Sequence, residues 1–233
     1  ATNIITAPAV CGIATLGIDH EGFLLAPEDG TPSDPMARIG FEKAGIAKVG
    51  VPLVVSRYAP HVRDAVAAQA EAAGATLIEK GDDWDARVEG GTLHYTDADG
   101  TLALPLPAMQ GTHQADNAAL AVAMLRNQSA LSVSAEALAI GITAMRWPAR
   151  MQRMSAGPLT GLAKGHAIWL DGGHNTDAGA ALAAFFAGRS AKMHLIIGML
   201  SNKDAGSILR PLAPHLASVT VVPVQGHEHH AAD

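Results

Sequence analysis

Short apolar runs alternate with polar, helix-compatible segments along the first third of the chain, a pattern typical of α/β proteins. Apolar runs at 10–16, 51–56 and 75–79 predict buried strands, and the segment 61–73 predicts a helix that Gly74 ends. A strand, a helix and a strand in this order predict a right-handed parallel crossover. We therefore expect a parallel sheet in this part of the chain.

The pattern changes to short alternating segments in the middle of the chain. Residues 87–95 alternate around Gly90-Gly91, which predicts a hairpin, and 101–106 predicts an additional edge strand. Two helices are expected next, at 115–126 and 135–145. The middle region is thus expected to combine an antiparallel sheet with helices.

A proline marks the boundary that we expect between two domains. Pro148 disfavours helix at Trp147, which gives domains of residues 1–147 and 148–233. Beyond this boundary, strands and helices are expected to alternate, at 167–170, 176–188, 193–198, 205–212 and 218–222. This order predicts a doubly wound, Rossmann-like α/β module.

Charge and composition exclude several classes of partner. The net charge of -6 and the lack of a Lys/Arg run argue against nucleic acid and anionic membranes. No apolar run reaches the roughly 20 residues that span a bilayer, and no signal peptide opens the chain, so we expect a cytoplasmic protein. The single Cys11 lies in an apolar run and is expected in the core rather than as a reactive thiol.

The ends of the chain suggest that it belongs to a longer protein. It starts without methionine, stops after a histidine-rich stretch, and contains no glycine-rich GxxxxGK[ST] phosphate loop. The final histidines, His227, His229 and His230, have only Glu228 as a nearby acidic neighbour. We interpret them as part of a solvated loop rather than as metal ligands.

Two residues between the first and second predicted strands are candidates for a functional site. His20 follows Asp19 at the end of that strand, where a neutral imidazole can bind a divalent ion, and a surface histidine is the alternative. Lys43 lies in a glycine-flanked turn, Glu42-Lys43-Ala44-Gly45, and by itself is an ordinary helix-surface lysine. Neither residue alone identifies a site.

Two polar groups are suited to nucleotide binding. Asn117 and Gln114 share a face of a predicted helix, where their amides can donate to and accept from an adenine edge, or simply form an exposed polar face. Arg150, just past the boundary proline, is suited to neutralise a phosphate, and an interdomain salt bridge is the alternative.

Asp171 and His174 occupy the loop after the strand predicted at 167–170. Open α/β sheets place ligands at this position. Between them, Gly172-Gly173 allows close approach of the backbone to a substrate, and Asn175 is positioned to cap the next helix. This loop is therefore a candidate ligand site.

These residues belong to short blocks whose order along the chain resembles the Mur-ligase superfamily of ATP-dependent amide-forming enzymes. The resemblance is strongest to the folylpolyglutamate synthase and dihydrofolate synthase branch, and it covers nearly the whole chain. The blocks are Ala1-Thr2-Asn3-Ile4, Gly17-Ile18-Asp19-His20, Phe41-Glu42-Lys43-Ala44-Gly45-Ile46, Gly111-Thr112-His113-Gln114 with Asn117-Ala118-Ala119, Arg146-Trp147-Pro148-Ala149-Arg150, Asp171-Gly172-Gly173-His174-Asn175 and Gly198-Met199-Leu200-Ser201-Asn202-Lys203-Asp204.

The resemblance implies an α/β fold in which the latter part of a Mur-ligase-type central ATPase domain precedes an incomplete, Rossmann-like glutamate-ligase domain. It implies that His20 is a magnesium ligand. It also implies that Lys43 becomes carbamylated, which converts a cation into a carboxylate-like group that helps to hold the metal.

The same resemblance assigns the other residues and the reaction. Asn117, Arg150 and Asp171 are implied to contact ATP, and His174 to lie near the incoming amino acid. ATP then phosphorylates a carboxylate of dihydropteroate or a folate, and L-glutamate attacks the acyl phosphate. ATP, Mg2+ and these small molecules are the expected partners of a monomeric enzyme, of which this fragment alone is expected to be inactive.

Two alternatives remain open. A Mur ligase proper joins amino acids to a nucleotide-linked sugar peptide by the same chemistry. A non-catalytic remnant or binding module is the second alternative, because the phosphate loop is missing from these residues.

The sequence departs from the family pattern at three places. The segment 24–35 is longer than the usual link and is expected to be an inserted surface loop. Ala149 stands where the family more often has glycine, and Thr176 stands where it usually has proline.

Overall fold

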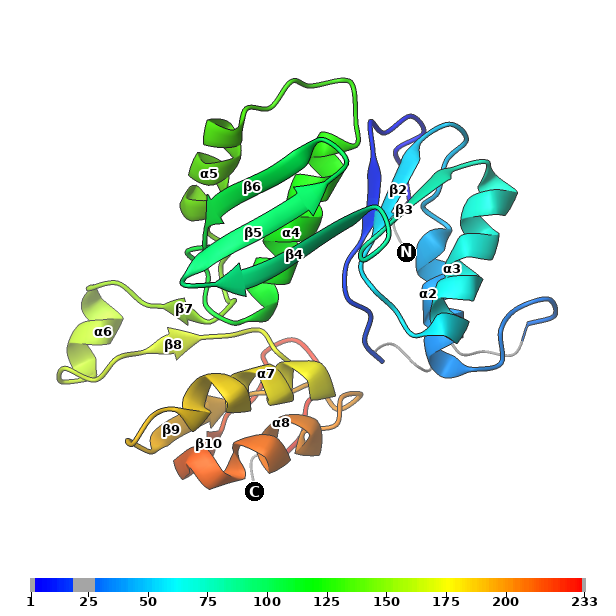
Figure 1. Cartoon of the computed structure of the whole chain (residues 1–233). Coiled ribbons are helices and arrows are strands. Elements are labelled where there is room, and N and C mark those ends of the chain that lie inside the picture. The colour runs from blue at the N-terminus through cyan, green and yellow to red at the C-terminus, as the bar shows by residue number, and fades with distance from the viewer. Residues whose placement is uncertain (1–2, 19–27, 232–233) are drawn as a thin grey trace. The chain divides into compact units, whose positions relative to one another are not determined.

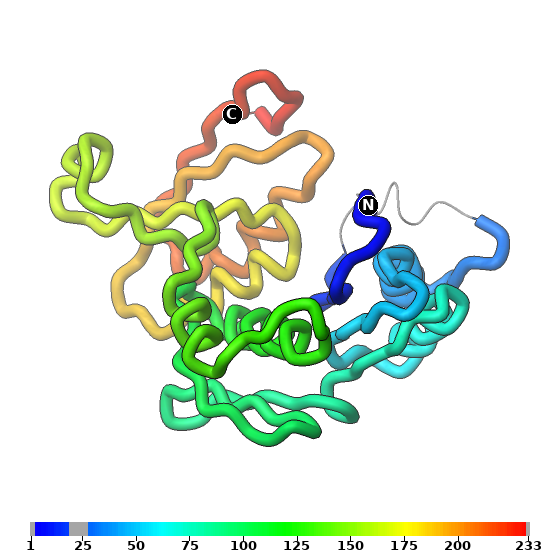
Figure 2. Tube along the Cα trace, turned by 90° about the horizontal axis from the view of Figure 1, so that it is seen from above, coloured from blue at the N-terminus to red at the C-terminus, as the bar shows by residue number. Residues whose placement is uncertain are grey.

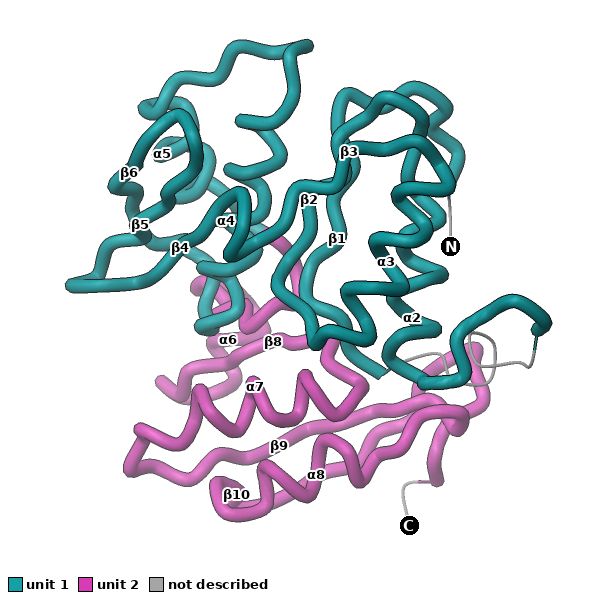
Figure 3. Tube along the Cα trace, turned by 45° about the vertical axis from the view of Figure 1, so that its right-hand side comes forward, with its two compact units in different colours: residues 1–146 teal, residues 147–233 magenta. Residues whose placement is uncertain are grey.

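The computed structural model describes residues 3–18 and 28–231, and it divides into two compact units (Figures 1 and 3). The first unit is Ala1–Arg146 and the second is Trp147–Asp233. This division lies one residue from the boundary expected between Trp147 and Pro148. The assignment of an ATP-binding and a glutamate-ligase role to the two units stays a prediction.

A three-stranded parallel sheet forms the first part of unit 1. Its strands are β1 (Cys11–Ile13), β2 (Pro52–Val55) and β3 (Thr76–Glu79), in the order β1-β2-β3. All three predicted strands and their parallel pairing are confirmed. The strands are shorter than the apolar runs, because the flanking residues continue into loops.

Two helices pack against each other beside this sheet, α2 (Pro35–Ala44) and α3 (Pro60–Ala73) (Figure 1). Helix α3 was predicted, and Gly74 ends it in the left-handed conformation with φ 68°. Leu53, Val55 and Val66 lie in the core between these helices and the sheet, each at most 1% exposed.

Helix α2 was not predicted, and its presence corrects two expectations. Asp34 is the N-cap, with its carboxylate accepting from the Ala37 amide at 2.8 Å, and Pro35 occupies the first turn. The expected loop at 24–35 therefore ends in a helix start, and its residues up to 27 lie outside the described part. Lys43 lies in the last turn of α2 rather than in a glycine-flanked turn, in agreement with the alternative of an exposed helix-surface lysine.

The second sheet of unit 1 is antiparallel, as predicted. It consists of β4 (Trp84–Glu89), β5 (Thr92–Asp97) and β6 (Gly100–Pro105), in the order β4-β5-β6. Gly90 and Gly91 connect β4 to β5 with φ values of 57° and 78°. Two consecutive positive φ values are what a two-residue hairpin turn requires, and glycine adopts them without strain.

Helices α4 (His113–Arg126) and α5 (Ala135–Ala144) follow, close to their predicted bounds. Helix α4 contacts β1 and β2 of the first sheet and β4 and β5 of the second. Its residues Ala119, Val122 and Ala123 are at most 1% exposed and share one hydrophobic cluster with Val54 and Tyr95. Figure 2 follows this unit from blue (β1) to green (α4 and α5).

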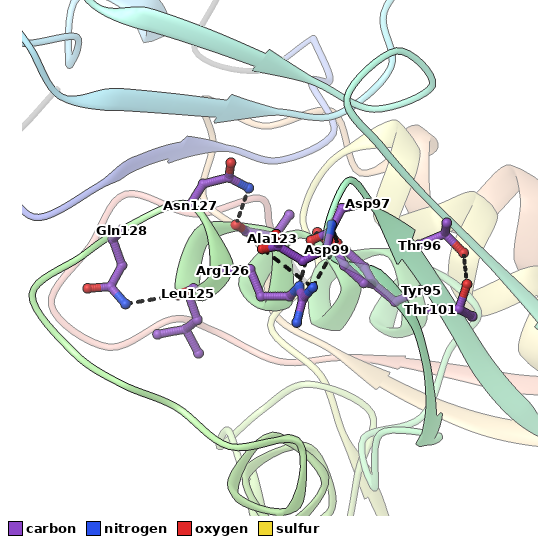
Figure 4. A network of polar contacts seen from close by, with 10 residues as sticks. All are labelled: Tyr95, Thr96, Asp97, Asp99, Thr101, Ala123, Leu125, Arg126, Asn127 and Gln128. Carbon is purple, nitrogen blue, oxygen red and sulfur yellow. Dashed lines mark hydrogen bonds and ion pairs between the residues drawn. The ribbon is translucent and has the colours of Figure 1, made fainter.

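A network of polar contacts attaches the end of α4 to β5 (Figure 4). The Arg126 guanidinium donates to both carboxylate oxygens of Asp97, at 2.5 and 2.7 Å, and the Tyr95 hydroxyl donates to Asp97 Oδ2 at 3.0 Å. These hydrogen bonds, the one from Arg126 above all, hold the pKa of Asp97 below its usual range. Burial raises the pKa of Tyr95, so its hydroxyl stays a donor.

Unit 2 contains two small sheets. Strands β7 (Gln152–Arg153) and β8 (Trp169–Leu170) form an antiparallel ribbon, and β9 (Met193–Ile197) pairs in parallel with β10 (Leu216–Val221). Every strand predicted in this region is present. The strand predicted at 167–170, however, pairs with β7, a two-residue strand too short to predict, rather than with a parallel neighbour.

The helices of unit 2 are α6 (Pro158–Leu162), α7 (Thr176–Ala187) and α8 (Gly206–Leu212), followed by a 3-10 turn at Ala213–His215. Helices α7 and α8 pack side by side (Figures 1 and 3). Ile208 and Leu212 of α8 lie in the core with Leu182 of α7. Among the helices of the described residues, none has the length and apolar character needed to cross a bilayer.

Gly179 permits the close contact between α7 and α8. A Cβ at this position would lie 2.2 Å from the Ser207 carbonyl oxygen and 3.1 Å from Pro211 Cγ. We predict that Gly179→Ala lowers the free energy of unfolding of unit 2 by about 1–3 kcal/mol, because a backbone atom cannot move aside as a side chain can. Urea unfolding followed by circular dichroism measures the change.

Gly188→Ala is the matched control for this substitution. Gly188 ends the same helix with φ −82°, and a Cβ there meets nothing within 4 Å. The free energy of unfolding of the Gly188→Ala variant should stay within about 0.5 kcal/mol of that of the parent. Equal stability of the Gly179 and Gly188 variants would contradict the packing argument.

The Asp97 contacts predict a specific pH dependence for unit 1. Since the folded-state pKa of Asp97 lies below its unfolded value, the carboxylate stabilises the fold above that unfolded value, near 4, and this contribution is lost as pH falls through the folded pKa. Asp97→Asn should therefore cost about 1–2 kcal/mol at pH 7 and progressively less below about pH 4.

Unfolding free energies at several pH values check this, with Asp99→Asn as the control. The Asp99 side chain is 80% exposed and lies 3.7 Å from Arg126, so its removal should change little at any pH. If the Asp97 variant and the parent differ by the same amount at pH 3 and pH 7, the proposed origin of the stability is wrong.

Candidate functional site

Two loop segments of unit 2 meet at one end of the β7–β8 ribbon. The Gly172 amide donates to the Ala149 carbonyl at 2.9 Å. The Asp171 carboxylate accepts from the Met151 amide through Oδ2 and from the Gly173 amide through Oδ1, both at 2.7 Å. One side chain thus holds two segments that lie some twenty residues apart in the sequence.

Arg150 lies between the two residues that these hydrogen bonds fix. Its guanidinium is exposed and donates from Nη1 to the carbonyl of Ala149 at 3.1 Å. A Cβ on Gly172 would come within 3.0 Å of Arg150 Nη1, so the missing side chain leaves space for the guanidinium. Most of the five N–H groups of this exposed guanidinium face no acceptor within the described structure.

His174 and Asn175 complete this loop. His174 Nδ1 lies 2.9 Å from the carbonyl oxygen of Gly172, and the ring is exposed. Asn175 caps α7, as expected, by accepting from the Ala178 amide at 2.9 Å. The structure therefore brings Arg150, Asp171 and His174 together at the beginning of a helix.

The chemistry of this loop suits an anionic ligand. A guanidinium forms paired hydrogen bonds with phosphate or carboxylate oxygens. The amino end of α7 adds the partial positive charge of a helix start. Asp171 already accepts two backbone hydrogen bonds, so it first of all organises the loop, while its remaining lone pairs can accept from a ligand.

The backbone next to Arg150 is strained. Ala149 and Met151 have φ values of 54° and 43°, in the left-handed region that disfavours side chains. The hydrogen bonds to Gly172 and Asp171 involve these two residues directly. In the sequence, only Ala149 pointed to this strain, because it stands where the family that the chain resembles more often has glycine. Nothing in the sequence marked Met151.

In unit 1, Asn117 lies on the exposed side of α4. Its Nδ2 donates to Gln114 Oε1 at 3.4 Å, which confirms that the two amides share a face. Gln114 is only 6% exposed, and its Nε2 lies 3.0 Å from His113 Nε2. The buried Gln114 therefore orients Asn117, a role that the sequence did not distinguish.

Of the two expected metal ligands, only Lys43 lies in the part of the chain that the structure describes. His20 lies outside the described residues. Lys43 is exposed, and its neighbour Glu42 accepts from the buried Arg38 at 2.9 Å. Within 3–18 and 28–231, no group of three or more His, Cys, Asp or Glu side chains is placed to hold a metal.

The histidines near the end of unit 2 contact backbone carbonyls. His229 Nδ1 lies 2.9 Å from the carbonyl oxygen of His227, and His230 Nε2 lies 2.6 Å from that of Lys203. All three histidines are exposed, in agreement with the expected solvated loop.

The chain is similar in sequence to known enzymes over nearly its whole length. No family model matches the chain. The chain is 29% identical to folylpolyglutamate synthase of Lacticaseibacillus casei, over 97% of this chain and 51% of that protein. It is 31% identical to dihydrofolate synthase/folylpolyglutamate synthase of Escherichia coli K12, over 97% of this chain and 49% of that protein.

The solved structures agree with the sequence comparison. E. coli FolC in complex with ADP superposes with a TM-score of 0.79 at 30% identity, over 99% of this chain and 51% of that one. A bifunctional folylpolyglutamate synthase/dihydrofolate synthase with Mn, AMPPNP and L-glutamate bound gives a TM-score of 0.76 at 29% identity, with 99% and 51% coverage. The chain spans about half the length of the curated relatives it matches.

The left-handed backbone at Ala149 gives a prediction for this loop. Ala149→Gly should raise the free energy of unfolding of unit 2 by about 0.5–1 kcal/mol, because glycine relieves the strain of φ 54° at some cost in chain entropy. Urea unfolding measures the difference. Ala184→Gly, in the exposed middle of α7, is the opposite control and should lose about 0.5–1 kcal/mol. Destabilisation by both substitutions would exclude strain at Ala149.

Proposed function

Because the chain belongs to the folylpolyglutamate synthase and dihydrofolate synthase family, over the half of those proteins that it matches, we propose that the protein is an ATP-dependent carboxylate-amine ligase. It adds L-glutamate to dihydropteroate or to a folate. The observation that carries the proposal is the exposed Arg150 guanidinium, whose neighbour Met151 donates its amide to Asp171 at the start of α7, in a chain that matches these enzymes over 97–99% of its own length.

The reaction joins two anions and therefore needs positive charge. A carboxylate oxygen of the pterin substrate attacks the γ-phosphorus of ATP, which gives an acyl phosphate and ADP. The amine of glutamate then attacks the acyl carbon and phosphate leaves, which forms the amide. Catalysis of this kind depends on position and on electrostatic stabilisation rather than on a protein nucleophile.

We assign Arg150 to the transferring phosphate, because its exposed guanidinium faces few acceptors in the described structure. Asp171 maintains the loop and contacts ATP through its remaining lone pairs. We assign His174, which is exposed and contacts the Gly172 carbonyl, to the incoming amino acid. Asn117, oriented by Gln114, reads the adenine edge.

Magnesium and the carbamylated lysine belong to this proposal as well. His20 and Lys43 would hold the ion, with nucleotide oxygens and water at the remaining positions, and the ion would neutralise phosphate charge. Lys43 is exposed at the end of α2, where CO2 can reach its amine. The described residues alone do not complete a metal site.

The folate branch is preferred over a Mur ligase proper. The relatives described above are named folylpolyglutamate synthase or dihydrofolate synthase, and one of the solved structures has both L-glutamate and AMPPNP bound. We also propose that the protein acts in the cytoplasm as a monomer. Both statements follow from the resemblance and from charge and composition, as argued for the sequence.

Release of ADP tests the proposal directly. The protein, expressed from its complete reading frame, is given ATP, Mg2+ and L-glutamate with dihydropteroate, tetrahydrofolate or a nucleotide-sugar peptide in separate reactions. Glutamate-dependent release with either pterin supports the folate ligase. Release only with the sugar peptide moves the assignment to the Mur branch. If the folded protein releases no ADP with any of the three substrates, a non-catalytic role is supported.

The same assay tests Arg150. Arg150→Gln should lower kcat by about 10²- to 10³-fold, as expected when one charged donor to a transferring group is removed. Arg87→Gln is the control, because Arg87 lies on the exposed strand β4 and pairs only with Glu89 in the described structure. Equal turnover by the two variants would show that Arg150 does not take part in the transfer of the phosphate.

A further inference from the structure

The connection between β7 and β8 lines an open cavity of about 480 Å³ in unit 2. The connection contains α6 and extends the ribbon through a hydrogen bond from the Met154 amide to the Ile168 carbonyl at 2.9 Å. Arg153, Ser155, Thr160 and His166 provide the polar part of its lining. We call this space the β7–β8 cavity.

The chain around the cavity is basic, although the protein as a whole is acidic. The net charge is -6, yet no Asp or Glu occurs between Glu136 and Asp171. The same stretch carries four cations, Arg146, Arg150, Arg153 and Lys164. Two of these cations, Arg153 and Lys164, lie at the start of the β7–β8 connection and within it, so this connection carries positive charge and no acidic residue.

The polar groups of the lining have unused donors. Within the described residues, the Arg153 guanidinium, the Ser155 hydroxyl and the His166 ring have no hydrogen-bond or ion-pair partner. The Thr160 hydroxyl, in contrast, is engaged with the backbone of Gly157. No carboxylate lines the cavity to neutralise Arg153. A guanidinium, a hydroxyl and an imidazole without a counter-ion suit an anion with carboxylate oxygens.

The ribbon gives the cavity a fixed position relative to the candidate site. Arg153 pairs with Trp169, two residues before Asp171, so the cavity adjoins the Asp171 loop. Trp169 in turn contacts Phe185 of α7 edge to face, with ring centroids 5.2 Å apart, and the Arg189 guanidinium lies 4.4 Å from the Phe185 ring. These contacts anchor the ribbon to α7, the helix that begins after the Asp171 loop.

We propose that the β7–β8 cavity binds the free carboxylates of a glutamate chain that is already attached to the substrate. The inference rests on the proposed function, since each glutamate added by such a ligase leaves one carboxylate free. Arg153 pairs with one of these carboxylates, and Ser155 and His166 donate to it. The site would thus favour substrates with several glutamates over those with one.

Direct binding tests this without catalysis. The protein is titrated calorimetrically with γ-linked triglutamate, free glutamate and inorganic phosphate. We expect triglutamate to bind more tightly than glutamate or phosphate, and Arg153→Gln to weaken its binding by about 5- to 10-fold, as for loss of one charge-assisted pair. Arg87→Gln, which removes the same charge from β4, should bind triglutamate as the parent does.

Each other outcome overturns the proposal in a distinct way. Equal affinity for phosphate and triglutamate would show that the cavity binds anions without preference for carboxylates. An effect of Arg87→Gln as large as that of Arg153→Gln would show that net charge alone determines binding. No binding of triglutamate by the folded protein would exclude the site. Because ADP release is measured separately, failure of the ligase assay with intact triglutamate binding would instead refute the proposed function.

Discussion

The close packing of helix α4 between two sheets determines the form of unit 1. Its inner face consists of small residues, Ala119, Val122 and Ala123, which let the helix approach both sheets and leave almost none of this face exposed. Burial of such a face contributes roughly 25 cal/mol for each Å² of apolar surface removed from water. A larger side chain on this face would have to displace β2 or β5, so one helix fixes the spacing of the two sheets.

The polar residues at both ends of α4 depend on that position. At its end, Arg126 reaches the carboxylate of Asp97 on β5 in a paired geometry. At its start, Gln114 is buried and holds Asn117 on the exposed side. Packing in the middle of the helix therefore sets the positions of the groups at its ends, one of which we assign to the nucleotide.

Unit 2 positions its candidate residues by a different means. The loop with Arg150 has no large core beneath it, and it contains two left-handed residues that cost roughly 1–2 kcal/mol each. Two hydrogen bonds join this segment to the Asp171 loop. The Met151 amide donates to the Asp171 carboxylate, which contributes about 1.5–3 kcal/mol, and the Gly172 amide donates to the Ala149 carbonyl, which contributes about 0.5–1.5 kcal/mol. Their sum is close to the cost, so the Asp171 loop holds the backbone on both sides of Arg150 in a conformation that the local sequence disfavours.

The sequence predicted what periodicity and turn chemistry encode, and missed what depends on tertiary contacts. The buried strands and the Gly90-Gly91 turn follow from local pattern. Helix α2 was not predicted, because its Asp34-Pro35 start carries the same residues as the end of a loop. Strand β7 has two residues and no periodicity of its own, so its pairing with β8 could not be foreseen.

The same distinction applies to the candidate site. The loop position of Asp171 and the cap at Asn175 were predictable from residue type. The hydrogen bond from Met151 to Asp171 joins distant segments, and no local signal announces it. The roles of His20 and Lys43 rested on resemblance alone, and they stay predictions.

The charge distribution gives a physical reason why an acidic protein can handle anionic substrates. A net charge of -6 repels anions over distances near the Debye length, which is about 8 Å at physiological ionic strength. The acid-free stretch between Glu136 and Asp171 creates a local exception, where four cations lie within one segment. Because screening limits the influence of distant acidic residues, an anion at Arg153 meets a lining without carboxylates. An anion at Arg150 also meets the neighbouring Asp171, whose carboxylate already accepts from two backbone amides. Specificity for carboxylates at one surface is thus compatible with an acidic surface elsewhere.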